Sequence, residues 1–177
     1  MELKLRTCVV RSWRETDARS IAQHANNRRV WINLRDRFPH PYTLAHAHDF
    51  IHRALASVPE TNFAIDVHGE AVGGIGFMLH DDVERISAEI GYWLGEPFWG
   101  RGITTEALAA VTAHAMREHQ LLRVYAIPFD GNAASCRVLE KVGYTCEGRM
   151  RRSAIKDGRV IDQLLYAYVD ERAPDAV

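Results

Sequence analysis

The stretch Ile86–Leu108 constrains the fold of this chain more than any other part of the sequence. Apolar residues occupy every second position of Ile86–Leu94, which predicts a strand with one buried face. A turn containing Gly100 and Gly102 follows, and from Thr104 onward apolar residues recur at helical spacing. A strand, a glycine-containing turn and a helix in this order bring free backbone N–H groups and the positive end of the helix to one point. Such a point suits a phosphate group, although glycines before a helix also occur in ordinary turns.

Two other phosphate-binding motifs do not match this turn. A P-loop needs Gly-Lys-Ser/Thr after four spacer residues, whereas Gly102 is followed by Ile103. A dinucleotide fingerprint needs a third glycine, and the two candidate stretches have Thr105 and Leu79 at that position. The turn therefore indicates neither nucleoside-triphosphate nor nicotinamide chemistry.

The spacing of apolar residues changes along the chain and predicts a mixed α/β fold. Helices are expected over residues 18–25, 29–35, 43–57, 104–119 and 133–142. Strands are expected over residues 8–10, 63–67, 71–79, 86–94, 122–128 and 163–169, the last of them in a hairpin that turns at 156–159. This order predicts one sheet with helices on both faces. Because 177 residues make about one domain, residues 1–177 are expected to form a single unit with a loose tail at 171–177.

Composition narrows the classes of protein to which the chain can belong. Its 22 basic and 23 acidic residues give a formal charge of −1, which argues against a nucleic-acid partner. No run approaches the roughly 18 apolar residues of a membrane helix, and the first residues alternate charged and apolar types instead of forming a signal peptide. Three cysteines without paired spacing argue against a disulfide framework. We therefore expect a cytoplasmic protein with neither a nucleic-acid nor a membrane partner.

A second informative cluster, at residues 129–144, follows a predicted strand and opens a predicted helix. It contains the pattern Asn132-x-x-Ser135-x-x-Val138-Leu139-Glu140-Lys141-x-Gly143-Tyr144. With this cluster and the earlier turn in order, about thirty residues apart, the chain resembles the GNAT N-acetyltransferase superfamily over about residues 11–169. Residues 90–94 and 98–107, with Glu147-Gly148, are typical of its ribosomal-protein N-terminal (Rim-type) branch. The resemblance implies a mostly antiparallel sheet that splays between the strands at 86–94 and 122–128.

The same resemblance implies acetyl-CoA as co-substrate, bound in the splay and at the glycine turn. The pyrophosphate is then held by the backbone amides of Gly100, Arg101, Gly102, Ile103, Thr104 and Thr105. The pantetheine arm pairs with the main chain of Tyr92, Trp93 and Leu94. Asn132 bonds the arm from the far side, and Arg137 reaches the nucleotide phosphate.

Acetyl transfer to an amine needs a base, an oxyanion donor and a means of releasing the thiolate. Glu89 is the candidate base, acting through a water, and a salt bridge that only holds the strand or the substrate charge is the alternative. An N–H near Trp93 or Leu94 is the expected oxyanion donor. Many relatives protonate the thiolate with a tyrosine at the position of Leu139. The remaining hydroxyl is that of Ser135, which serves either as the acid or as a hydrogen bonder at the helix start.

The expected acceptor is an N-terminal α-amine of a protein. An α-amine with a pKa of about 7.8 is neutral in about a tenth of molecules at pH 7, against about one in two thousand for a lysine amine. The difference of about 3.5 kcal/mol favours the α-amine for an enzyme with one base and no tyrosine acid. The alternatives are a small-molecule amine (an amino acid, a polyamine or an antibiotic) and a non-catalytic acyl-CoA-binding module. The resemblance is also compatible with a homodimer.

Two further sets of side chains bear on the mechanism. Cys136 and Cys146 have no recognisable base partner, so direct transfer without a covalent enzyme intermediate is expected. His46, His48 and His52 have a spacing that would suit a metal, but no cysteine completes it, and the segment reads as a solvated helix face. We therefore expect no metal.

Overall fold

The computed structural model describes residues 1–171, which form one eight-stranded sheet with the order β1-β2-β3-β4-β5-β6-β8-β7. The strands are β1 (Glu2–Lys4), β2 (Val9–Arg11), β3 (Asn62–Val67), β4 (Glu70–Leu79), β5 (Ser87–Leu94), β6 (Arg123–Ala126), β7 (Thr145–Lys156) and β8 (Arg159–Val169). Neighbouring strands are antiparallel except β5 and β6, which are parallel. The predicted tail lies, apart from its first residue, outside the described residues.

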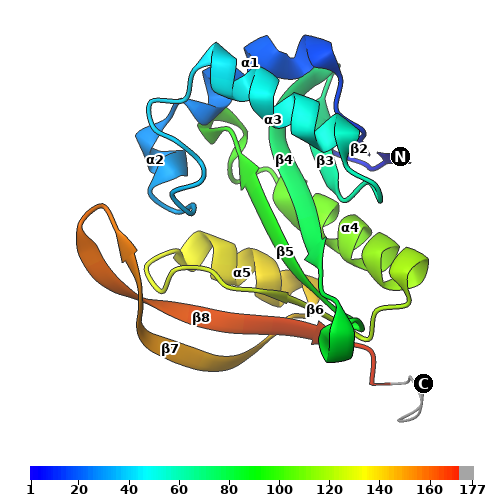
Figure 1. The fold of residues 1–177 in the computed structure, drawn as a ribbon, viewed down its shortest axis with the longest axis vertical. Helices are drawn as coiled ribbons and strands as arrows, with labels where there is room; N and C mark the ends of the chain where they lie inside the picture. The colour runs from blue at the N-terminus through cyan, green and yellow to red at the C-terminus, as the bar shows by residue number, and fades with distance from the viewer. Residues whose placement is uncertain (172–177) are drawn as a thin grey trace.

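Helices cover both faces of this sheet (Figure 1). They are α1 (Ala18–Ala25), α2 (Arg28–Trp31), α3 (Leu44–Ala56), α4 (Ile103–His119) and α5 (Ala133–Val142). Side chains of β3 alternate between two cores, because Ala64 packs beneath α1 and α3 while Phe63 and Ile65 pack with the residues of α4 and α5. The structure thus confirms the predicted mixed α/β fold. No helix within residues 1–171 has both the length and the apolar content needed to span a bilayer.

The second helix is shorter than predicted. The pattern favours a helix over 29–35, but α2 ends at Trp31. The residues beyond it are held by tertiary contacts instead: Phe38 packs against Tyr42 and Trp93, with ring centroids 4.8 and 5.6 Å apart. Residues 32–43 therefore form an irregular segment, which is called the 32–43 segment below.

One strand was not predicted, and two others differ from their predicted bounds by two residues or more. The unpredicted strand, β1, pairs with β2, with Leu3 opposite Val10. The strand predicted at 122–128 ends at Ala126. The last strand begins at Arg159 rather than at residue 163, because β7 and β8 pair as far as the hairpin turn.

A buried ion network joins β2, β3 and the 3₁₀ turn Glu15–Asp17. The guanidinium of Arg11 donates to both carboxylate oxygens of Asp17 at 2.8 and 2.9 Å and to Asp66 at 2.8 Å. All three side chains are buried. Asp17 also accepts from the Arg14 N–H and Asp66 from the Gly69 N–H, so the charges are hydrogen-bonded as well as paired.

Replacing Arg11 with methionine should destabilise the protein by about 3–5 kcal/mol, since two buried carboxylates lose their cation. Urea unfolding of the wild type and the variant measures this difference. Arg117→Met is the matched control, because Arg117 pairs with Glu118 on the exposed side of α4, where an ion pair contributes about 1 kcal/mol or less. Equal losses in the two variants would show that the network is not a major source of stability.

Candidate functional site

The predicted splay lies between β5 and β6. These strands pair over only three residues of β5, ending where Glu89 lies opposite Tyr125. Beyond that point β5 continues to Leu94 along β4, whereas β6 continues along β8. One edge of β5 is therefore left without a strand partner over its last five residues.

The register decides which backbone groups face this open edge. The Gly95 N–H donates to the Val72 C=O of β4 at 2.8 Å, and the Ser87 C=O accepts from the N–H of His80, directly after β4, at 3.3 Å. Because the backbone groups of a strand alternate in direction, the N–H of Trp93 also faces β4, while those of Tyr92 and Leu94 face the splay. Of the two N–H groups expected as oxyanion donors, those of Trp93 and Leu94, only the N–H of Leu94 faces the splay.

The glycine turn lies at the end of this open edge. Gly100 and Gly102 have φ values of +75° and +79°, in the left-handed region that favours glycine. Gly102 precedes the first residue of α4, and no side chain caps the helix there. The buried side chain of Ile103 anchors the turn in the core. No capping side chain accepts hydrogen bonds from the first N–H groups of α4, so these groups can bond to a ligand.

The other residues predicted at the turn have distinct places. The Trp99 indole N–H donates to the Leu94 C=O at 2.7 Å and ties the turn to β5. Arg101 is exposed and lies over the ring of Phe98, at 5.4 Å. Thr104 and Thr105 lie in the first turn of α4 and are half-buried. A phosphate placed here would meet the start of a helix and an arginine.

The start of α5 lies across the splay from β5. Asn132 is the N-cap of α5, and its Oδ1 accepts from the Ser135 N–H at 3.1 Å, which leaves the amide NH₂ to donate elsewhere. Arg137 is exposed on α5 and makes no ion pair within the described part of the chain. Its contact with a nucleotide phosphate stays a prediction.

A tyrosine hydroxyl that the sequence analysis did not single out reaches Ser135. The Tyr92 OH lies 2.7 Å from the Ser135 Oγ, so the side chain of Tyr92 bridges β5 and α5. Burial raises the pKa of Tyr92 to about 12, which keeps this hydroxyl protonated at neutral pH. The alternation of apolar residues in Ile86–Leu94 places Tyr92 on the buried face, and this was the sequence feature that could have indicated a role for its hydroxyl.

Glu89 lies on the opposite face of β5 and is paired. The Arg35 guanidinium, from the 32–43 segment, donates to the Glu89 carboxylate. Next to it, Tyr125 bonds through its OH to His80 Nε2 at 2.8 Å, with the two rings stacked. The predicted salt-bridge alternative for Glu89 is thus present, and it leaves the carboxylate 17 % exposed beside the splay.

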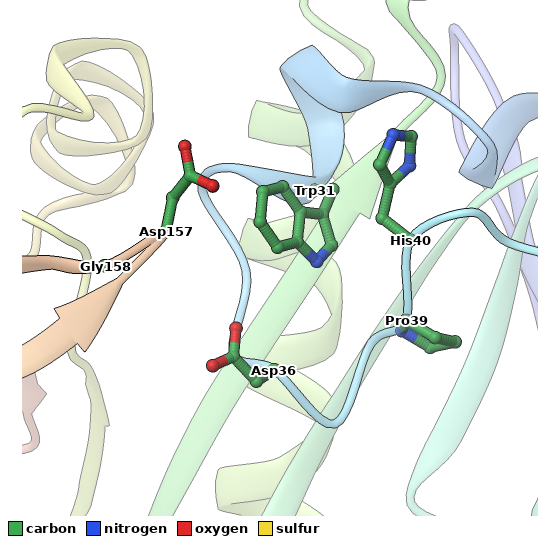
Figure 2. Close-up of a pocket in the computed structure, with 6 residues that line it drawn as sticks. All are labelled: Trp31, Asp36, Pro39, His40, Asp157 and Gly158. Carbon is green, nitrogen blue, oxygen red and sulfur yellow. The ribbon is translucent and has the colours of Figure 1, made fainter.

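Two hollows lie around the tip of the β7–β8 hairpin. The larger, of 480 Å³, is lined by α2, the loop at Phe129–Gly131 and the hairpin tip. The smaller, of 410 Å³, lies between the 32–43 segment and the tip, where Figure 2 shows the Trp31 ring between Asp157 and His40.

Of the three histidines considered as metal ligands, His46 caps the start of α3. His46 forms a capping box with Thr43, in which each backbone N–H donates to the other side chain at 3.2 and 3.3 Å. Within residues 1–171 no three His, Cys, Asp or Glu side chains are grouped closely enough to hold a metal ion.

Comparison with known proteins gives the following matches. Residues 8–145 match the family model described as Acetyltransferase (GNAT) domain. The putative ribosomal N-acetyltransferase YdaF of Bacillus subtilis (strain 168) is 35% identical over 99 residues, 56% of this chain and 54% of that protein. The ribosomal-protein-serine acetyltransferase of Escherichia coli (strain K12) is 31% identical over 107 residues, 60% and 59% of the two chains. The chain therefore matches between half and two thirds of the length of these curated relatives.

Solved structures share the fold over nearly the whole chain. RimL, a ribosomal L7/L12 alpha-N-protein acetyltransferase in complex with coenzyme A, superposes with a TM-score of 0.84 at 22% identity and covers 96% of this chain and 98% of that one. MccE, a microcin C7 self-immunity acetyltransferase with acetyl-CoA and AMP, has a TM-score of 0.82 at 22% identity and covers 94% of each chain.

Replacing Gly102 with alanine should destabilise the protein by about 1–2 kcal/mol, because an L side chain in the left-handed region costs that much. The added Cβ would meet no atom within 4 Å, so any loss comes from backbone conformation alone. Gly148→Ala is the matched control, since Gly148 also faces open space but has no positive φ. Urea unfolding that gives equal stabilities for the two variants would contradict the prediction.

Proposed function

Because this chain belongs to the GNAT acetyltransferase family, we propose that it transfers the acetyl group of acetyl-CoA directly to a primary amine, and that this amine is the N-terminal α-amine of a protein. The observation that carries the proposal is the open edge of β5, which runs from Glu89 to the uncapped start of α4. Residues 1–171 would then form one acetyltransferase domain.

Acetyl-CoA fits this edge in one direction. Its pyrophosphate would lie on the N–H groups between Gly100 and Thr105, where the helix end favours an anion. Its pantetheine amides would bond to the N–H and C=O of Tyr92 and the N–H of Leu94, as an added strand does. The NH₂ of Asn132 would donate from the α5 side. Two neighbours of the same fold, RimL and MccE, hold coenzyme A and acetyl-CoA.

The transfer itself then follows from the surrounding groups. The neutral amine attacks the thioester carbonyl carbon, the C–S bond breaks, and coenzyme A leaves as its thiolate. The Leu94 N–H faces the carbonyl oxygen as it becomes an oxyanion, a contact of a kind that contributes about 3 kcal/mol. Glu89 takes the proton of the amine through a water. Arg35 holds the carboxylate in place on the acceptor side of β5.

The thiolate leaves on the other side of β5, beside the two hydroxyls. Tyr92 OH and Ser135 Oγ are within hydrogen-bond distance, and either can donate to the other. If Tyr92 donates to Ser135, the Ser135 proton is free to point at the sulfur. A hydrogen bond to a charged group contributes about 1.5–3 kcal/mol, so this pair would replace the tyrosine that is absent at Leu139.

A small-molecule amine remains a second candidate acceptor. The hollow of 480 Å³ beside the hairpin tip is within the size range of small-ligand pockets, about 300–1,000 Å³. Its lining combines apolar side chains with charged ones, namely Ile32, Phe129, Ile161, Arg28, Lys156, Asp157 and Arg159.

Coenzyme A release should occur with peptides that have a free N-terminus and should be at least about 100-fold slower with N-acetylated peptides whose only amine is a lysine.

Replacing Glu89 with glutamine should lower kcat about 100-fold because the base is lost, with acetyl-CoA affinity unchanged in calorimetry. Glu84→Gln, in the exposed turn Asp82–Glu84, is the control and should keep full activity. Release with polyamines or amino acids alone would favour the second candidate, and binding without release would indicate a non-catalytic module.

Tyr92→Phe and Ser135→Ala should each lower kcat about tenfold, because each removes the oriented hydroxyl that faces the thiolate. The double variant should lose no more than either single variant, since both changes break one hydrogen-bonded pair. Tyr144→Phe is the matched control: its buried OH bonds to Thr112 at the same 2.7 Å, in a pair that includes neither Tyr92 nor Ser135. Steady-state kinetics that show multiplying losses in the double variant would contradict a shared role.

A further inference from the structure

The tip of the β7–β8 hairpin carries a buried cation that the proposed reaction does not use. The Lys156 side chain is only 3 % exposed. Its Nζ donates to Asp36 Oδ1 at 2.8 Å and lies 3.7 Å from the centre of the Trp31 ring. A buried ammonium is costly unless a carboxylate and further contacts compensate it, so these two contacts tie the tip to the end of α2 and to the 32–43 segment.

The 32–43 segment, which accepts the hydrogen bond from Lys156, also contacts Glu89. Asp36 directly follows Arg35, and the Arg35 side chain extends the other way to Glu89. This part of the chain belongs to no helix or strand. Turn bonds shape it, from the Leu34 N–H to the Trp31 C=O at 3.0 Å and from the Phe38 N–H to the Arg35 C=O at 2.9 Å. The position of the Arg35 backbone therefore depends on what holds its neighbours.

A second contact at the same tip is much weaker. Arg28 of α2 pairs with Asp157 at 2.6 Å, but these side chains are 60 % and 39 % exposed. Exposed pairs contribute little because water screens them and both side chains must be ordered. The Lys156–Asp36 pair differs in that its cation is buried, although Asp36 is 73 % exposed, so Lys156 is the main polar tie between the hairpin tip and the 32–43 segment.

We propose that Lys156 is a positioning residue for acetyl transfer: by holding Asp36 it fixes Arg35, and Arg35 in turn holds the Glu89 carboxylate where the acceptor amine arrives. The inference rests on the proposed role of Glu89 as base. It connects strands β7 and β8, which contribute no group to the reaction, with the chemistry at β5.

Lys156→Met, which keeps the length and apolar stem of the side chain, should lower kcat about tenfold by displacing the base. Asp36→Asn should have the same effect, and since Asp36 is largely exposed this variant is the safeguard if Lys156→Met fails to fold. Acetyl-CoA affinity should not change in either. Glu147→Gln is the control, because it breaks an ion pair with Arg123 at the other end of β7.

A double-variant cycle separates positioning from general loosening. In an Arg35→Met background, Lys156→Met should lower kcat less than about twofold, because the link to Glu89 is already broken. A further tenfold loss in that background, or wild-type kcat in Lys156→Met, would overturn the proposal. If Glu89→Gln leaves kcat intact, the role of Glu89 as base fails, and the proposal with it. If the wild type releases no coenzyme A with any amine, the proposed function fails instead.

A second readout does not depend on any acceptor. The NMR signals of the Arg35 guanidinium should be resolved in the wild type, because rotation is hindered when the group is held against Glu89. They should merge in Lys156→Met and Asp36→Asn. Identical Arg35 spectra in the wild type and both variants would overturn the proposal even if no acceptor were found.

Discussion

Parallel pairing between β5 and β6 stops after Glu89 and Tyr125, and the rest of the site depends on that point. Backbone N–H and C=O groups must find partners, and past this point those of β5 that face away from β4 have no strand to bond. The Leu94 C=O is satisfied by the Trp99 indole. The N–H and C=O of Tyr92 and the N–H of Leu94 remain without a strand partner, on a strand that pairs with β4 from Ala88 to Leu94.

The alternation of β5 then sorts the chemical groups between its two faces. Tyr92 points toward α5 and meets Ser135, while Glu89 points the other way and meets Arg35. In the proposed reaction the thiolate leaves on one face and the amine loses its proton on the other. A single extended strand can separate these events because successive side chains must point in opposite directions.

The same separation explains why the periphery matters. The α4 and α5 side is built from helices whose ends are defined by caps and glycines, so its geometry is local. The Glu89 side is built from the irregular 32–43 segment, which has to be held by other parts of the chain. In the middle of that segment Phe38 packs on Trp93, and two residues earlier Asp36 accepts a hydrogen bond from Lys156.

Sequence pattern predicted the parts of this structure that short-range rules control. The apolar alternation of Ile86–Leu94, the glycines before Thr104 and the Asn132 cap each have a local physical cause, and each element lies where it was expected. The resemblance to a family supplied the splay, which no local pattern of 122–128 contains.

Contacts between distant residues were decided only by the tertiary structure. Packing ends α2 at Trp31, where the sequence pattern continues. The Tyr92–Ser135 and Arg35–Glu89 contacts each join residues that lie on different elements. Lys156 and Asp36 are 120 positions apart, and nothing in either neighbourhood indicates the other. By itself, then, the sequence determined the strand, turn and helix that suit a phosphate, because backbone geometry there depends on neighbouring residues. Tertiary packing decided which cation pairs with which carboxylate. A buried charge is costly unless it is paired, and the partner is whichever opposite charge the fold brings next to it.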